Sequence, residues 1–574
     1  YTYIYKLFYL IAAASICAAV GSAHRKGCFM TKIMYATMMF SLALACPALA
    51  QSPIPTFDKE AVTVHPYNRT GRQDVIVDEA TSEAYLPGNT GTDREPAFFV
   101  RQITLTGFPL PDEQGRLKEI VNAYSGRSVK VSELKELTDA ITKYAKSSGY
   151  TVAQAVVPPQ EIAGGQLEIK VYVAAYDEVR ITQNTSDVAD SVLQGYLYRL
   201  KQGEVMTDRE LELAMNNLND LPGVTARAVL RPGREEGTTS VDVEVERRPV
   251  WNNYVFADNG GGYYSGRYRY GFHTEINNPG GDGDKVTLSG MMSSHDVKNY
   301  SVRYETPAGR GGTRLGAAFS QSEYELHTNS LYTSLGRSRG ISLYGMTPLY
   351  RDRMNRLTAM YGYDRRDMED SYRFRTASWP ELKVGKRADV WHAGLSGSQY
   401  YPNEFTQYDL IYWYGDMDTD GGAYYDGAYH KLTGSLLKIW YDGLWNYRVR
   451  FQGQLANRAL DGSEQFYLGG MNGVRAYGNN DGYGDAGWLG SVEIRRQTGV
   501  EGLEAAAFID EGYGNNKAVG YSEHLSGWGL GLRYSKPNDW YVQLDWARKI
   551  DGRRDWSEPT DHDDRWWFQV YKMF

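Results

Sequence analysis

Two glycine-rich segments have the spacing of known nucleotide-binding and catalytic motifs. Residues 482–487 (GYGDAG) fit G-x-G-x-x-G, whose backbone amides hold a pyrophosphate where a strand leads into a helix. Residues 336–340 (GRSRG) fit G-x-S-x-G, which exposes a nucleophilic serine at a tight turn between a strand and a helix. A strand-like sequence follows each segment, so neither has the helix that its chemistry needs. We predict that both matches arise by chance, with Ser338 and its neighbouring arginines facing the inside of a β-structure.

The rest of the sequence offers little other chemistry. It contains no P-loop lysine motif and no H-E-x-x-H, and its nine histidines show no metal-ligand spacing. The carboxylates of Asp282, Asp284 and residues 416–420 (DMDTD) are a candidate Ca²⁺ site, although exposed turns account for them more simply. The sequence therefore predicts no enzyme activity, no cofactor and no metal site.

Composition narrows the class of protein. The formal net charge of −8 gives no basic excess for a nucleic-acid partner. A mean hydropathy of −0.52 excludes a bundle of transmembrane helices but not a transmembrane β-barrel, whose strands alternate apolar and polar residues. The 46 tyrosines, 13 tryptophans and 61 glycines suit such a barrel, with aromatic rings at the membrane surfaces. A soluble all-β protein rich in aromatic residues fits the composition equally well.

The first fifty residues have the form of a targeting segment. Lys32 begins a short basic region, an apolar run follows over residues 33–45, and an A-x-A site ends at Ala50. We predict translation from Met30 and cleavage after Ala50, with residues 1–29 as upstream sequence.

All three cysteines precede that cleavage site: Cys17, Cys28 and Cys46. A chain cleaved after Ala50 would contain no thiol for a disulfide or a metal, which suits a large protein that is exported unfolded. A lipoprotein anchor at Cys46 is the alternative interpretation.

Residues 51–248 divide into a linker and a repeat. Residues 51–96 are polar and proline-rich and read as a linker. Residues 97–173 then predict the order strand–helix–helix–strand–strand, with Ser132 as the cap of the second helix. Residues 175–248 repeat this order, and Thr207 is the expected cap of their second helix. Each copy is long enough to form a small core of its own.

From residue 250 to Phe574 the pattern alternates with a period of two. In residues 540–549 (WYVQLDWARK) the apolar side chains separate cleanly from polar ones such as Gln543 and Asp545. Alternation does not say which face is outside. At about 20 residues for each strand and loop, however, this length predicts about 16 strands, and a closed barrel of that size leaves an aqueous channel.

The complete order resembles a known family. A signal peptide, two repeated units and a C-terminal β-region that ends on Phe574 are together similar to the outer-membrane transporters of two-partner secretion (type Vb), the ShlB/FhaC/HecB family. This family belongs to the POTRA-bearing barrels that include BamA. Residues 158–171 and 211–233 resemble the family's two POTRA domains, and residues 277–290 an early turn of its barrel.

Two further motifs carry the resemblance within the barrel. Val474, Arg475, Ala476 and Tyr477 resemble the V-R-G-Y/F signature of the long sixth extracellular loop, and the segment Phe508 to Asp510 resembles the F-x-D motif of a nearby strand. Ala476 departs from the family's glycine, so the backbone after Arg475 must accept a Cβ atom.

The resemblance implies a loop that folds back into the barrel and places Arg475 against Asp510 on the inner wall. A guanidinium in a confined lumen needs a carboxylate that accepts two hydrogen bonds, which makes this pair physically reasonable. The alternative is that both side chains face water separately.

The resemblance also implies a fold, a location and a set of partners. A periplasmic linker (51–96) would lead into two periplasmic domains, POTRA 1 (97–173) and POTRA 2 (175–248). Residues 250–574 would form an antiparallel barrel of 16 strands in the outer-membrane lipid. Phe568, Val570 and Phe574 would form the signal that the barrel-assembly machinery reads, with Lys572 as a departure from the usual apolar residue.

The implied function is export. The POTRA domains would bind a large unfolded exoprotein, a TpsA-like adhesin, haemolysin or toxin, by β-augmentation. The barrel would then pass it to the cell surface without nucleotide hydrolysis. An outer-membrane insertase of the BamA/TamA type is the first alternative, although such proteins usually have three or more POTRA units. A passive porin is the second alternative, but a porin would lack the periplasmic domains that residues 97–248 predict.

Overall fold

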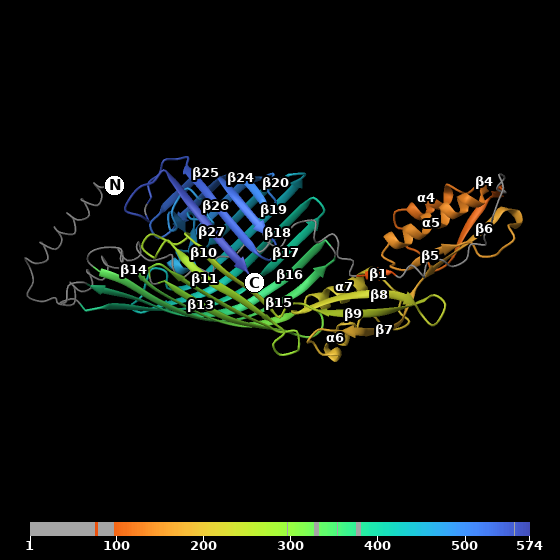
Figure 1. The fold of residues 1–574 in the computed structure, drawn as a ribbon, viewed down its shortest axis with the longest axis horizontal. Helices are drawn as coiled ribbons and strands as arrows, with labels where there is room; N and C mark the ends of the chain where they lie inside the picture. The colour runs from red at the N-terminus through yellow and green to blue at the C-terminus, as the bar shows by residue number, and fades with distance from the viewer. Residues whose placement is uncertain are drawn as a thin grey trace, which may run out of the picture.

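The computed structural model describes residues 75–77 and 97–574, except 296, 327–331, 353, 375–379 and 556. The expected signal peptide, start codon and cleavage site lie outside the described residues, as does most of the 51–96 linker. Two small α+β units extend in line from one end of a large barrel (Figure 1). Among the described residues, no helix is both long and apolar enough to cross a membrane.

The first unit packs two helices on a mixed sheet in the order β3-β6-β5, with β2 and β4 as a separate pair. Its elements are β2 (Ala97–Val100), β3 (Gln102–Gly107), α4 (Arg116–Asn122), β4 (Arg127–Lys130), α5 (Val131–Ser147), β5 (Ala153–Val156) and β6 (Gln166–Val173). Helix α5 buries Leu137, Ile141 and Ala145, which share one face. The prediction of Ser132 as its cap is wrong. The N-cap is Lys130, two residues earlier, and the Glu133 carboxylate accepts the backbone N–H of Lys130 at 2.8 Å.

The second unit repeats the order strand–helix–helix–strand–strand. Its elements are β7 (Ala175–Asn184), α6 (Asp190–Tyr196), α7 (Asp208–Asn219), β8 (Val224–Pro232) and β9 (Thr238–Arg247). The hydroxyl of Thr207 caps α7 by accepting the N–H of Glu210, as expected. Both helices bury apolar side chains against the inner face of the sheet, which gives the unit a core of its own.

A strand that the sequence did not predict completes this second sheet. Strand β1 (Val75–Val77) lies parallel to β8, with Val75 opposite Ala228 and Val77 opposite Leu230. The segment reads V-I-V, and β-branched residues favour a strand even where only three occur in succession. One edge of the second unit's sheet is therefore occupied by the chain that precedes both units, and the opposite edge strand is β7.

Sixteen antiparallel strands close the barrel, which confirms the number expected from its length. They are β10 (Trp251–Asp258), β11 (Arg269–Asn277), β12 (Lys285–Ser293), β13 (Lys298–Pro307), β14 (Arg314–Leu326), β15 (Tyr332–Arg351), β16 (Asn355–Phe374), β17 (Leu382–Tyr401), β18 (Glu404–Thr419), β19 (Gly427–Asp442), β20 (Trp445–Ala456), β23 (Ala486–Gln497), β24 (Leu503–Asn516), β25 (Tyr521–Lys536), β26 (Trp540–Lys549) and β27 (Asp564–Met573). The closing seam between β10 and β27 is short, with five residue pairs from Tyr254–Met573 to Asp258–Gln569.

Alternation places apolar side chains on the outside of the barrel, as in other membrane barrels of this size. Ile341 and Leu343 of β15 are exposed, for example, whereas Asp545 of β26 is buried inside. The expectation that Arg337 and Arg339 face the interior is wrong. Both share the outward face of Ile341, and Arg337 pairs with Glu323 at 2.8 Å. About ten residues of a tilted strand cross a membrane, so the outer part of the twenty-residue β15 can carry outward charges in water.

The second unit is fixed to the rim of the barrel from which it extends. Asp220, at the end of α7, forms an ion pair with Arg351 at the end of β15. Two turns of the rim also pack closely against the second unit. A Cβ atom on Gly283 would lie 2.7 Å from Leu221, and one on Gly312 would lie 2.8 Å from Asn217. Glycine is needed in these turns because the residues around the Leu-Pro-Gly motif occupy the space of a side chain.

Candidate functional site

Residues 457–485, between β20 and β23, form a long loop that folds into the barrel. The loop contains η4 (Gly462–Glu464) and a small hairpin of β21 (Phe466–Tyr467) and β22 (Tyr483–Gly484). At its tip, Val474, Ala476 and Tyr477 are fully buried. They pack with wall residues Leu489, Phe508, Leu525 and Ala547. The tip is therefore held on the inner wall formed by β23 to β26.

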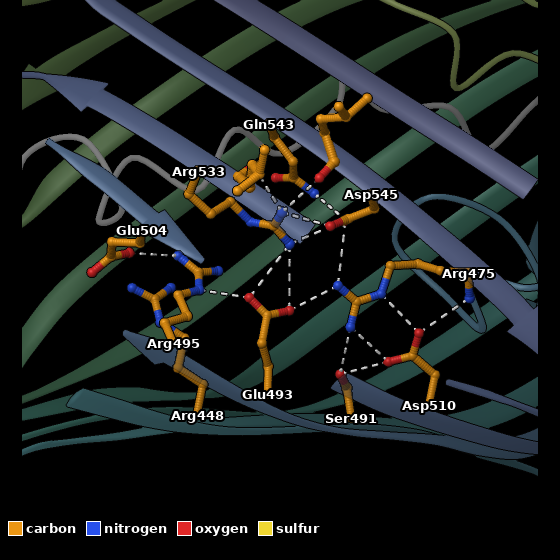
Figure 2. A network of polar contacts seen from close by, with 12 residues as sticks. Arg448, Arg475, Ser491, Glu493, Arg495, Glu504, Asp510, Arg533, Gln543 and Asp545 are labelled. Atoms are coloured by element: carbon orange, nitrogen blue, oxygen red, sulfur yellow. Dashed lines mark hydrogen bonds and ion pairs between the residues drawn. The ribbon is translucent and has the colours of Figure 1, made fainter. Parts of the chain in front are cut away.

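The structure places Arg475 of this tip directly against Asp510 of β24. The Arg475 Nε and Nη2 groups donate to the two carboxylate oxygens of Asp510, each at 2.8 Å, and the backbone N–H of Arg475 adds a third contact at 3.2 Å (Figure 2). Arg475 is 3% exposed and Asp510 is 1% exposed. This two-pronged geometry is the strong form of a carboxylate–guanidinium contact, and burial removes the screening by water.

Three further residues that the sequence did not single out bind the same guanidinium. Glu493 accepts from Arg475 Nη1 at 2.7 Å, Asp545 lies 3.4 Å from Nη1, and the Ser491 hydroxyl lies 3.2 Å from Nη2. All three lie on the polar faces of β23 and β26, so the alternation of these strands was the signal that could have found them. It did not reveal which of many polar lumen residues meet at one point.

Two wall arginines balance the carboxylates of this network. Arg533 contacts Asp545 at 2.5 Å and Glu493 at 3.4 Å, and Arg495 contacts Glu493 at 2.5 Å (Figure 2). Around Arg475, three carboxylates thus face three guanidinium groups, and Arg495 also pairs with Glu504 of β24 at 3.7 Å (Figure 2). Such matching is needed because an unpaired buried charge is strongly unfavourable.

The motif residues beside Arg475 and Asp510 support the contact. The Phe508 ring lies under the guanidinium, with Arg475 Cζ 3.2 Å from the ring centroid, which is a cation–π geometry. A Cβ atom on Gly527 of β25 would lie 2.5 Å from the Cβ atom of Ala476. A wall glycine therefore provides the space for the alanine that replaces the usual glycine of the loop motif.

The barrel's last strand also holds the loop tip. The indole Nε1–H of Trp567 in β27 donates to the carbonyl oxygen of Arg475 at 2.6 Å, and the Tyr477 hydroxyl donates to Asp551. The tip is thereby connected to the strand that closes the barrel at the short β10–β27 seam.

We expect Trp567→Phe to weaken the closed position of the loop. An aromatic six-membered ring is kept, but the indole N–H is lost, so the buried carbonyl of Arg475 loses its donor at a cost of about 1–3 kcal/mol. This cost would shift the equilibrium between the closed and open positions of the loop about 5- to 150-fold toward the open one. Single-channel recordings of the purified protein in KCl would show longer open times. Trp566→Phe is the matched control, because Trp566 points outward and is 60% exposed. Equal open times in the two variants would contradict this role of Trp567.

The proposed assembly-signal residues lie on or directly after β27. Val570 pairs with Ala257 of β10, and Phe574 is exposed at the end of the chain. Lys572, the departure from the usual pattern, forms an ion pair with Asp539 and lies with its Nζ 5.0 Å from the centroid of the Trp540 ring. Its apolar stem can cover that ring while its ammonium group is paired, so the lysine fits this position.

The two glycine-rich motifs have structural roles. Residues 336–340 lie within β15, and residues 482–487 run through β22 into β23. In the second segment the Asp485 carboxylate accepts the N–H groups of Leu460 at 2.9 Å and Lys517 at 2.7 Å. Asp284 accepts the N–H of Gly280 within a turn. Across the described ranges, no group of three or more His, Cys, Asp or Glu side chains could hold a metal ion.

These features define a class of protein: an outer-membrane β-barrel with preceding α+β units and a lumenal loop fastened through an arginine. Residues 98–173 match the family model of the POTRA domain, ShlB-type. Residues 237–534 match that of the haemolysin secretion/activation protein ShlB/FhaC/HecB. The chain belongs to the ShlB/FhaC/HecB family.

Similar proteins agree with this family. The heme/hemopexin transporter protein HuxB of Haemophilus influenzae (strain 86-028NP) is 25% identical, over 80% of this chain and 84% of its own. The solved structure of CdiB from Escherichia coli superposes with a TM-score of 0.66 at 20% identity, covering 85% of this chain and 93% of CdiB. BamA from Haemophilus ducreyi lacking POTRA domains 1–3 has a TM-score of 0.53 at 14% identity, covering 83% and 100% of the two chains, and shows the barrel fold alone.

The protein is therefore a two-partner secretion transporter of the outer membrane, with its POTRA region in the periplasm. Members of this family translocate exoproteins across the outer membrane. The rim that carries the α+β units is accordingly the periplasmic rim, and the insertase and porin alternatives have less support.

Proposed function

We propose that this chain exports one large unfolded exoprotein, a TpsA-like adhesin, haemolysin or toxin, and that Arg475 and Asp510 hold the gate of its pore closed. The observation that carries this proposal is the buried ion network at the loop tip. Three carboxylates of the wall converge on one guanidinium of the loop. A merely structural loop would not need to place a paired charge in the lumen of a channel.

Recognition is assigned to two POTRA domains, at residues 97–173 and 175–248. Their sheets have edge strands to which an extended polypeptide can add through backbone hydrogen bonds. In the second domain, β1 already occupies the β8 edge. An incoming strand must therefore displace β1 or bind at the β7 edge.

The transport step follows from the closed geometry. A chain that enters the lumen must move the loop tip away from the β23–β26 wall, which separates Arg475 from Asp510. Folding of the exoprotein at the cell surface then favours net movement outward, without nucleotide hydrolysis. Outer-membrane lipid surrounds the apolar outer face of the barrel, and the barrel-assembly machinery reads Phe568, Val570 and Phe574 during biogenesis.

Co-expression with a large secreted protein, to be sought in the reading frames that flank this one, tests the export function. We expect exoprotein at the cell surface or in the medium with the complete chain. It should remain in the periplasm when residues 97–173 are deleted, because the docking domain is then missing. Heat-modifiable migration of the barrel on gels checks that the deleted chain still folds.

The rival functions give different outcomes in the same cells. If the chain were an insertase, its depletion would lower the amounts of other outer-membrane barrels. If it were a porin, it would admit small sugars in cells that have no exoprotein gene. Unchanged export after deletion of residues 97–173 would contradict the proposed recognition step.

A further inference from the structure

The base of the long loop is held by a second ion cluster, separate from the one at its tip. Asp461 and Glu464, at the start of the loop, are 6% and 2% exposed. Lys386 of β17 binds the Asp461 carboxylate at 2.9 Å, and Lys431 of β19 binds the Glu464 carboxylate at 2.6 Å. Arg366 of β16 also pairs with Glu464. The charges are reversed relative to the tip, because here the loop supplies the carboxylates and the wall supplies the cations.

Apolar packing and backbone contacts reinforce the base. Leu460 is buried against wall residues Met368, Ala388, Val390, Met417 and Tyr429. The side-chain amide of Gln454 donates to the carbonyl oxygen of Glu464 at 2.9 Å. The carboxylate of Asp485, at the far end of the loop, accepts from the Gln465 amide at 3.0 Å. The two ends of the loop are thus tied together at the β16–β20 sector of the wall.

Releasing the two clusters would have unequal consequences. If the tip leaves, Asp545 keeps Arg533 and Glu493 keeps Arg495, so chiefly Asp510 loses its cation. If the base leaves, Lys386 keeps Asp370 of the wall, whereas Lys431 and Arg366 both lose the carboxylate that they contact. Release of the base thus leaves two wall cations without the carboxylate that they contact, whereas release of the tip leaves one wall carboxylate without its cation. Buried charges without a partner are strongly disfavoured.

We infer that Asp461 and Glu464 are positioning residues that keep the base of the loop on the β16–β19 wall while the tip swings away. This inference rests on the proposed export function. The loop then moves as a hinged flap, and the space that opens lies beside β23 to β26. The exoprotein passes between the loop tip and that sector of the wall.

Spin labels at the two ends of the loop test the inference. A chain that begins at residue 51 contains no cysteine, so Asn472→Cys near the tip and Ala459→Cys near the base can each be labelled uniquely with a nitroxide. Each label is placed in the otherwise unchanged chain, in Arg475→Ala and in Asp461→Asn/Glu464→Gln. Continuous-wave spectra of the purified, reconstituted barrel then report the mobility of each end.

We expect the two variants to loosen different ends. Arg475→Ala should shift the residue 472 spectrum to the fast-motion regime and leave the residue 459 spectrum slow. Asp461→Asn/Glu464→Gln should shift the residue 459 spectrum while the tip label stays slow. Glu305→Gln is the matched control: this buried carboxylate of β13 pairs with Lys285 of β12 at 3.3 Å, on strands that belong to neither cluster, and its neutralisation should change neither spectrum.

Two results would overturn the hinge. One is equal mobilisation of both labels by Arg475→Ala; the other is a residue 459 label that stays slow in Asp461→Asn/Glu464→Gln. If the double variant no longer shows heat-modifiable migration and so fails to fold, Glu464→Gln alone replaces it in the same measurement. Failure of the unaltered chain to export the co-expressed exoprotein would contradict the proposed function, whereas these spectra decide the hinge separately.

Discussion

Arg475→Ala is expected to reduce export of the exoprotein to background while the barrel still inserts into the outer membrane. The substitution leaves Asp510 buried without its guanidinium, and removing one member of a buried ion pair costs about 3–5 kcal/mol. The closed position of the loop loses its main contact. An unheld tip then has no fixed place in the lumen, so ions pass more often, but the tip obstructs the path of the exoprotein. The sixteen-strand ladder does not involve the Arg475 side chain, so barrel assembly should persist.

Quantitative blots of medium, cell surface and periplasm measure this effect. Arg475→Lys keeps the charge but loses the two-pronged contact, so we expect intermediate export. Arg337→Ala is the matched control, because it removes a guanidinium from the outside of the same barrel. Normal export by Arg475→Ala would exclude the loop as the gate.

Locking the tip to the wall should block export reversibly. The Cγ2 atom of Val474 lies 3.1 Å from the position that a Cβ atom on Gly512 would take. The Val474 Cβ atom is one bond away from Cγ2, which is compatible with the roughly 3.5–4.5 Å that separates the Cβ atoms of a disulfide. In Val474→Cys/Gly512→Cys we expect export to stop under oxidising conditions, because the tip cannot leave β24. A reductant should restore it.

The two single cysteine variants control for the substitutions themselves. Each should export with or without oxidant, since residues 51–574 supply no other thiol. Gel mobility with and without reductant shows whether the disulfide has formed. Full export by the oxidised, cross-linked protein would mean that the exoprotein passes without movement of the tip.

Much of the barrel could be predicted because the alternation of apolar and polar residues is a property of each single strand. Alternation along single strands identified the β-region, and the length of that region predicted about sixteen strands, which the structure confirms. The orientation of Arg337 was predicted wrongly because not every polar residue of a long strand lies at membrane depth. Strand β1 was missed because three residues carry too little pattern.

The site was less accessible to sequence reasoning. A resemblance, not periodicity, brought Arg475 and Asp510 together, and their role as a gate stays a prediction. Glu493 and Asp545 lie 18 and 70 residues from Arg475 in sequence, and they meet it only through the register of the closed barrel. The base cluster of Asp461 and Glu464 depends in the same way on strands that are far apart in the sequence.

The second α+β unit is attached to one arc of the barrel rim. Its α7 end rests on the rim beside Gly283, Gly312 and Arg351, and these residues belong to the arc from β11 to β16. The loop tip is held on a different arc, β23 to β26. If this unit captures the exoprotein as proposed, a pull on it would be transmitted first into strands that do not carry the tip network. Under the proposed function, the unit that holds the exoprotein and the loop tip that moves are separated around the circumference, so a held exoprotein would not pull directly on the tip.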